Sequence, residues 1–284
     1  MDIKIILSGN RAVCLQDGKE AFAAPLSDFV ERISGRGDAM TLNGPIPEGV
    51  RHAQRRGDAT VLVLEDRPQT RTVRWLADDS PAPFGPGAVY RNVRLAFPFV
   101  VIIVVFNAGR LTGVQQCFYR TEPIQSLQDP LFYPNLYNCA QTPQGRGYSM
   151  ESWLCLANLK DDFGPLTWEQ RSQLIHHHVW GGAFNRSSEV HEGNSLWQSV
   201  KADPRVSTVE RWAEESRQNP YFPLTVPWRP YGKSVGETAD AMLATVAPER
   251  PVTDAASLVG MLLARPASRR ARWMEMLQSV AGAK

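Results

Sequence analysis

Apolar residues recur along the first 80 positions at two different spacings, which predict strands in some segments and a helix in another. Short apolar runs near the N-terminus and again after residue 60 are typical of strands, and Asp17-Gly18 is typical of a turn between them. Residues 26–33 repeat at helical spacing, so their apolar side chains share one face. We expect a small α+β module, residues 1–80, with strands at 3–7, 12–15, 61–64 and 70–76.

A connection rich in proline and glycine follows this module. Residues 78–87 contain three prolines and two glycines, which resist both a helix and a strand ladder, so we expect the domain boundary there. Beyond it, Leu95–Phe106 reads as one apolar strand buried on both faces, residues 107–109 as a turn, and Gly113–Tyr119 as the returning strand. A central antiparallel sheet is therefore predicted.

The rest of the chain reads as a long loop followed by helices. Residues 130–155 show no clear period and contain several prolines and glycines, and long loops in compact domains are often functional. Thr167 is typical of a helix N-cap. The expected division is therefore an accessory α+β domain at 1–80, a central α+β domain at 88–230 and a helical extension at 231–284. The further predicted helices are 208–218, 254–264 and 267–280.

Composition excludes several classes of protein. The chain has 284 residues, of which 43% are hydrophobic and 21% charged, which is typical of a globular protein and not of a disordered one. Its longest apolar run has eight residues, far short of the roughly 20 that a membrane-spanning helix needs. The net charge of +2 argues against a nucleic-acid partner. No secretory signal is apparent at the N-terminus, so we expect a cytoplasmic location without a membrane association.

Cysteine and histidine spacing predicts neither a disulfide framework nor a metal site. The four cysteines show no CxxC spacing. The three consecutive histidines, His176–His178, point about 100° apart from one to the next on a helix, so neighbours cannot share a tetrahedral site. We therefore expect no metal and no cofactor, and each cysteine must be judged by its surroundings.

A tripeptide and a longer block lie at the two ends of this loop. The tripeptide is Tyr133-Pro134-Asn135, and the block runs Cys155-Leu156, Leu159-Lys160, Phe163, Pro165 and Leu166-Thr167. In order and spacing the sequence resembles the ubiquitin-conjugating enzymes, whose hallmark is a His-Pro-Asn tripeptide ahead of a Cys-Leu block that leads into a helix. The resemblance extends over about half of the chain, residues 95–230. It implies a ubiquitin-conjugating-like core in which an antiparallel sheet packs against helices.

Two departures from the family pattern matter. Tyr133 replaces the histidine of the tripeptide, and Cys155 follows Asn135 by 20 positions, well over double the usual gap. An insertion at about 140–152 would account for the gap. The overall arrangement is most similar to the divergent prokaryotic branch, PRTRC protein B-like, whose members occur beside ThiF-type activating enzymes and ubiquitin-like proteins. That branch implies a bacterial protein, with antiphage defence as one setting.

The resemblance implies an acyl transfer through a thiol. Cys155 would accept the C-terminal carboxylate of a ubiquitin-like protein from a ThiF-like activating enzyme as a thioester, then pass it to an amine on a protein target. Asn135 would stabilise the oxyanion or hold the loop, beside Tyr133. The insertion leaves the choice of nucleophile open, since Cys139 is also close, and an oxyester on Ser149 or Ser152 is an alternative.

Other functions are compatible with the same residues. Tyr133 in place of histidine favours a non-catalytic module that binds a ubiquitin-like protein, whereas Asn135 and the complete Cys155 block favour the enzyme. A hydrolase that pairs Cys155 with one of the three histidines would satisfy nucleophile-and-base logic but has no family motif. Residues 185–196 stand where conjugating enzymes have the loop that gates the cysteine, and the acidic residues of this segment could orient an incoming lysine.

Overall fold

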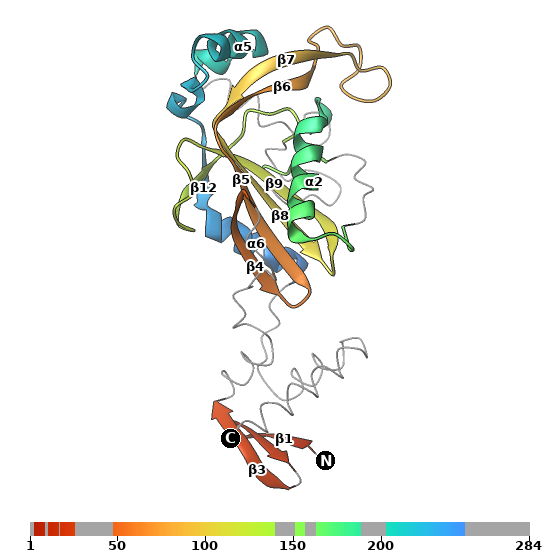
Figure 1. Ribbon diagram of the computed structural model, residues 1–284, viewed down its shortest axis with the longest axis vertical. Coiled ribbons are helices and arrows are strands. Elements are labelled where there is room, and N and C mark those ends of the chain that lie inside the picture. Colours follow the sequence, from red (N-terminus) through yellow and green to blue (C-terminus); the bar gives the residue numbers. More distant parts are fainter. Residues whose placement is uncertain are drawn as a thin grey trace. The chain divides into compact units, whose positions relative to one another are not determined.

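The fold class is α+β, as expected. The computed structural model describes residues 3–8, 11–16, 18–25, 48–139, 151–156, 163–188 and 203–247. They belong to two compact units, one containing the first three strands and the other covering residues 40–247 (Figure 1). None of the helices in the described ranges is long and apolar enough to span a membrane. The predicted helices at 26–33, 254–264 and 267–280 lie outside these ranges.

The first unit holds a three-stranded antiparallel sheet. Its strands are β1 (Ile3–Ser8), β2 (Arg11–Gln16) and β3 (Lys19–Pro25), in that spatial order. The two predicted N-terminal strands are therefore confirmed. Gly18 lies in the turn between β2 and β3 with a φ of 81°, a conformation that glycine adopts without a steric penalty.

The second unit is built on a six-stranded antiparallel sheet. Its spatial order is β12-β10-β9-β8-β5-β4, so most neighbours in space are neighbours along the chain. Ala108 and Gly109, with φ of 49° and 81°, form the tight turn between β8 and β9, which confirms the predicted hairpin. The strands are β4 (Val50–Arg56), β5 (Ala59–Asp66), β8 (Phe99–Asn107), β9 (Arg110–Arg120), β10 (Pro130–Phe132) and β12 (Pro230–Ser234).

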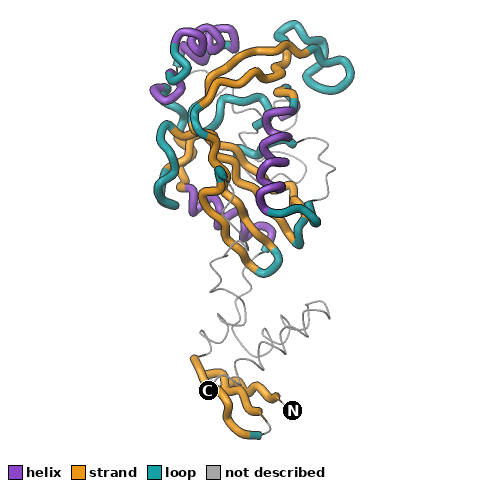
Figure 2. Tube along the Cα trace, viewed as in Figure 1, coloured by secondary structure: helices purple, strands orange, loops and turns teal. Residues whose placement is uncertain are grey.

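Helices cover both faces of this sheet (Figures 1 and 2). Even-numbered side chains of β8, such as Ile102, pack in one core cluster with residues of α2 (Trp168–Gly181). Odd-numbered side chains of β8, such as Ile103, pack in a second cluster with α6 (Val235–Val246). The prediction that this apolar strand is buried on both faces is therefore confirmed.

A bent ribbon connects the six-stranded sheet to a smaller one. The smaller sheet has the order β11-β6-β7, with β6 (Gln69–Leu76), β7 (Tyr90–Phe97) and β11 (Ala183–Phe184). The register is the same in both sheets, because the pairing of β5 with β8 continues without a shift as the pairing of β6 with β7. The segment predicted as one strand is two strands separated at Pro98, a residue without an N–H group for the ladder.

The proline-rich segment at 78–87 connects two paired strands. Leu76 pairs with Tyr90 across it, and Ser80 fixes the loop by donating to the carbonyl of Ala82 and accepting from the N–H of Val89. The compact unit of residues 40–247 therefore replaces the expected boundary near Pro81. Strand β12 and helix α6 also belong to this unit, although the sequence placed them in a separate extension.

Helix starts agree with the sequence. Thr167 caps α2 in a capping box with Gln170, and Thr208 caps α5 (Val209–Gln218). Arg171 fixes the first turn of α2 by donating to the carbonyls of Leu166 and Gly164 at 3.0 and 3.1 Å. Two short 3-10 helices, Pro204–Val206 and Phe222–Thr225, complete the described unit.

Candidate thiol site

The segment that carries Cys155 lies between β9 and residues 138–139. The backbone N–H groups of Cys117 and Leu154 donate to Ser152 and Gln115 at 3.1 and 2.9 Å, which joins the segment to β9. On its other side the N–H of Cys155 donates to the carbonyl of Asn138 at 2.8 Å. Residues 153 and 154 thus form two isolated bridges within a segment that has no regular strand, in agreement with the predicted loop.

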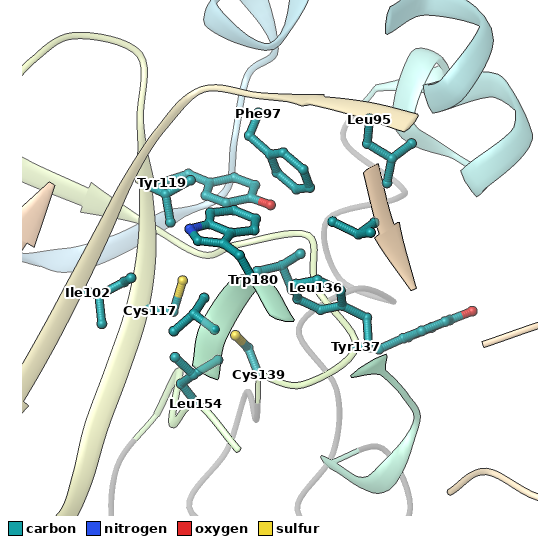
Figure 3. Packing of buried hydrophobic residues seen from close by; sticks show 14 of the residues in the cluster. Leu95, Phe97, Ile102, Cys117, Tyr119, Leu136, Tyr137, Cys139, Leu154 and Trp180 are labelled. Carbon is teal, nitrogen blue, oxygen red and sulfur yellow. The ribbon is translucent and has the colours of Figure 1, made fainter. Parts of the chain in front are cut away.

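The pairing of Leu154 with residue 139 decides where each thiol points. Cys139 and Leu154 form an antiparallel bridge, so their side chains share one face. Both are fully buried in the core cluster, where Figure 3 shows Cys139 beside Cys117 and Leu154. Asn138 and Cys155 occupy the adjoining positions, and Cys155 is partly exposed. The structure therefore separates Cys155 from Cys139, which the sequence left as alternatives.

The buried thiol of Cys139 is held in its protonated form. Burial raises its pKa well above the ordinary value, and the hydrogen bond and charge of the neighbouring Cys117 raise it further. A thiol of this kind is a poor nucleophile at neutral pH because the reactive species is the thiolate. Cys139 therefore behaves as a small core residue, and Cys117 is likewise fully buried in the core.

A closed circuit of hydrogen bonds surrounds Cys155. The carbonyl of Asn138 accepts from the Cys155 N–H, and the Asn138 side-chain oxygen accepts from the Asn185 N–H at 2.7 Å. The side-chain oxygen of Asn185 accepts from the Ser187 N–H at 2.9 Å. The Ser187 hydroxyl then donates to the Cys155 sulfur at 3.8 Å. Three residues from two other segments thus fix the position of Cys155.

Asn138 also ties the site to the smaller sheet. Its side-chain nitrogen donates to the carbonyl of Ala183 in β11 at 3.0 Å. Since β11 pairs with β6, the amide of Asn138 links the Cys155 segment to the bent ribbon. Sequence reasoning missed Asn138 as a site residue, and its position three residues after Asn135 carries no local signal for this role.

Asn135 is fully buried and lies against a different element. Its side-chain nitrogen donates to the carbonyl of Val206, in the 3-10 helix before α5, at 3.3 Å. Its side-chain oxygen has no hydrogen-bond partner within the described ranges. The described hydrogen bonds of Asn135 therefore hold the loop to the core and do not reach the sulfur of Cys155.

Tyr133 anchors the start of the Cys155 segment. Its hydroxyl donates to the Glu151 carboxylate at 2.5 Å, and the Arg229 guanidinium lies 4.7 Å from the centre of its ring. Burial, together with the hydrogen bond and the charge of Glu151, raises the pKa of Tyr133 well above its usual range. The phenol is therefore neutral at physiological pH and acts as a hydrogen-bond donor.

The serine alternatives have different outcomes. Ser152 is fully buried, its hydroxyl donates to the carbonyl of Cys117, and its φ is 59°. These contacts leave no access for an acyl donor. Ser149 lies outside the described residues, as do residues 189–196 of the predicted gating loop.

The histidine triplet lies on α2, and the first of the three, His176, contacts an acidic residue of β5. Asp66, at the end of β5, accepts from the Trp180 indole at 2.6 Å and lies 3.3 Å from the Nδ1 of His176. Burial opposes the charge of Asp66, but contacts with His176 and Trp180 and the charge of Arg71 outweigh it and lower the pKa of the carboxyl. Within the described ranges no group of histidine, cysteine and acidic side chains is arranged to hold a metal ion.

Comparisons with protein-family models, with curated proteins and with solved structures find no match for this chain. The chemistry of the site therefore rests on its own geometry.

Proposed function

We propose that the chain is a ubiquitin-conjugating-like acyltransferase that carries a ubiquitin-like protein as a thioester on Cys155. The observation that carries the proposal is the contrast between the two neighbouring thiols. Cys155 is partly exposed and accepts a hydrogen bond from Ser187, whereas Cys139 is buried in the core. A thiol that transfers an acyl group must be reachable by another protein, and the partial exposure of Cys155 favours it over the buried Cys139.

The order of elements supports the same proposal. An antiparallel meander of β4, β5, β8 and β9 precedes the Tyr133-Pro134-Asn135 tripeptide, and the Cys155 segment follows it. Helix α2 then begins after Thr167 and covers one face of the sheet. This succession of sheet, tripeptide, cysteine and helix is the one that the resemblance to conjugating enzymes implies.

The proposed reaction has two transfers. The Cys155 thiolate attacks the thioester carbonyl on a ThiF-like activating enzyme, so that a carbon–sulfur bond to Cys155 forms and the activating enzyme's cysteine leaves as a thiolate. An amine of the target protein then attacks the new thioester. A carbon–nitrogen bond forms, Cys155 leaves as a thiolate, and the amine releases a proton to solvent.

The remaining predicted site residues have supporting roles in this proposal. Asn135 holds the loop through Val206, which is the second of the two roles that the family assigns to its asparagine. Tyr133 holds Glu151, four residues before Cys155, in place of the family's histidine. Neither side chain is the nucleophile.

The test is the intact mass of the protein after incubation with a cognate activating enzyme, its ubiquitin-like protein and ATP. We expect an adduct of one ubiquitin-like protein that reducing thiols and hydroxide both cleave and that Cys155→Ala lacks. Cys139→Ala serves as the matched control and should still form it. A thiol-resistant adduct that persists in Cys155→Ala would move the nucleophile to a serine such as Ser149, and the lack of any adduct would favour a non-catalytic binding module.

A further inference from the structure

Ser187 contacts the sulfur of Cys155 although the two residues come from distant segments. Its hydroxyl donates to the sulfur at 3.8 Å, and its own N–H is fixed by the side chain of Asn185. Asn185 is fixed in turn by Asn138, whose carbonyl binds the N–H of Cys155. Asn138 thus fixes both the backbone of Cys155 and, through Asn185, the backbone of Ser187, which sets the position of the hydroxyl relative to the sulfur.

We propose that Ser187 is a positioning residue that holds the sulfur of Cys155 and favours its thiolate form, with Asn138 and Asn185 keeping the hydroxyl in place. The inference deepens the proposed function, because a thiolate is the nucleophile in both transfers. It concerns the reactivity of the thiol itself, which can be measured without any partner protein.

The physical basis is the difference between a thiolate and a thiol as hydrogen-bond acceptors. A hydrogen bond to an ionised acceptor is roughly twice as strong as one to a neutral acceptor. A hydroxyl directed at the sulfur therefore stabilises the thiolate more than the thiol. Cys139 shows the opposite arrangement, since its neighbour is another thiol and its burial disfavours charge.

Other titratable groups lie near Cys155 within the described residues 115–117, 138–139, 151–156 and 185–188. Glu151 is on the same segment, where it accepts from Tyr133. Cys117 and Cys139 lie on the two flanking segments and are buried. Arg186 precedes Ser187, and its described contact is a backbone donation to Pro83 at 3.1 Å. The Ser187 hydroxyl donates to the sulfur, and the charge of Cys155 acts on the neighbouring thiol of Cys139.

The experiment measures the rate at which iodoacetamide alkylates Cys155 in the folded full chain. The pH runs from about 6 to about 11, a range that includes the ionisation of a thiol. Mass spectrometry of the Cys155 peptide gives the rate at each pH. Ser187→Ala should slow alkylation at pH 7 by roughly three- to tenfold and move the midpoint of the pH–rate profile to higher pH. Rates of the variant and the wild type should converge above about pH 10, where the thiol is ionised in both.

Two further variants make the result specific. Ser187→Thr keeps the hydroxyl and should restore the wild-type profile. Ser188→Ala is the matched control, because this neighbouring serine is fully buried and its hydroxyl has no hydrogen-bond partner among the described residues, so the profile should not move. Asn185→Ala, which frees the N–H of Ser187, should shift the profile in the same direction as Ser187→Ala.

Two results would overturn the inference. One is a Ser187→Ala profile that matches the wild type. The other is a loss of rate by the same factor at every pH, because that indicates a change in access and not in ionisation. The alkylation test and the adduct test can fail separately. A shifted profile without any ubiquitin-like adduct would support the role of Ser187 and reject the transferase. An adduct with an unshifted profile would support the transferase and reject the role of Ser187.

Discussion

The two sides of the short ladder between residues 138–139 and 154–155 differ sharply in environment. On one side Cys139 and Leu154 are buried in the core, and burial keeps the thiol protonated. On the other side Asn138 and Cys155 join a circuit of polar groups, and the residue Cys155 is partly exposed. The two thiols lie on neighbouring backbone segments, yet we expect Cys155 to be reactive and Cys139 to be unreactive. The reason is that successive side chains of an extended segment point to opposite faces.

The largest expected effect of this difference is on the rate of alkylation. Cys155 in the folded protein should react with iodoacetamide at least about 100-fold faster than Cys117 and Cys139, since the latter two require local opening of the core. Quantitative mass spectrometry of the three peptides gives the ratio. In denaturant the three rates should converge, and rapid labelling of Cys139 in the native protein would remove the distinction between the two sides.

Substitution of the unreactive thiol should destabilise the protein more than substitution of the reactive one. Cys139→Ser places a hydroxyl in an apolar site and should lower the free energy of unfolding by about 1–3 kcal/mol. Cys155→Ser, on the open side, should change it by less than about 0.5 kcal/mol. Urea unfolding followed by tryptophan fluorescence measures both. Equal losses for the two variants would indicate that the sites are buried alike.

A smaller loss is expected when the link across the ladder is cut. Asn138→Ala removes two side-chain hydrogen bonds, to Ala183 and from Asn185, and should lower the free energy of unfolding by about 1–2 kcal/mol. The same variant should shift the pH–rate profile of Cys155 as Asn185→Ala does. If the stability falls while the profile is unchanged, Asn138 supports the fold without positioning Ser187.

The smallest effect concerns Tyr133 and appears at alkaline pH. The raised pKa of Tyr133 means that its stabilisation is complete below the ordinary tyrosine pKa of about 10 and is lost above it, because the unfolded chain then releases a proton that the folded chain retains. Tyr133→Phe should lower the free energy of unfolding by about 0.5–1.5 kcal/mol at pH 8. Above about pH 10, where tyrosine in the unfolded chain ionises, the stability of this variant should decline less steeply than that of the wild type. Tyr221→Phe, at an exposed position, is the control and should follow the wild type.

Local signals predicted much of the architecture. The apolar run in β8, the Ala108-Gly109 turn, the N-cap Thr167 and the helix over 208–218 are properties of neighbouring residues, and the structure confirms each. Helix α6 was missed although Ser234 and Glu237 form a capping box at its start. The signal was present, but the prolines before it suggested the end of the domain.

Predictions that required knowledge of pairing were less successful. Residues 78–87 have the composition of a linker, yet the strands on either side pair in one register, so the segment is a hairpin loop. Pro98 interrupts an apolar run whose hydrophobicity alone suggests a single strand. Composition describes a segment's own preference and does not show which distant segment it pairs with.

The sequence by itself determined the class of fold, the buried central strand, the start of α2 at Thr167 and a short set of candidate nucleophiles. Only the tertiary structure decided among the candidates, because the direction of each thiol depends on how residues 138–139 align with residues 154–155, and a shift by one residue would exchange the two faces. The circuit through Asn138, Asn185 and Ser187 has the same origin. Its members come from segments whose proximity is set by the folded sheet, and no spacing along the chain encodes it.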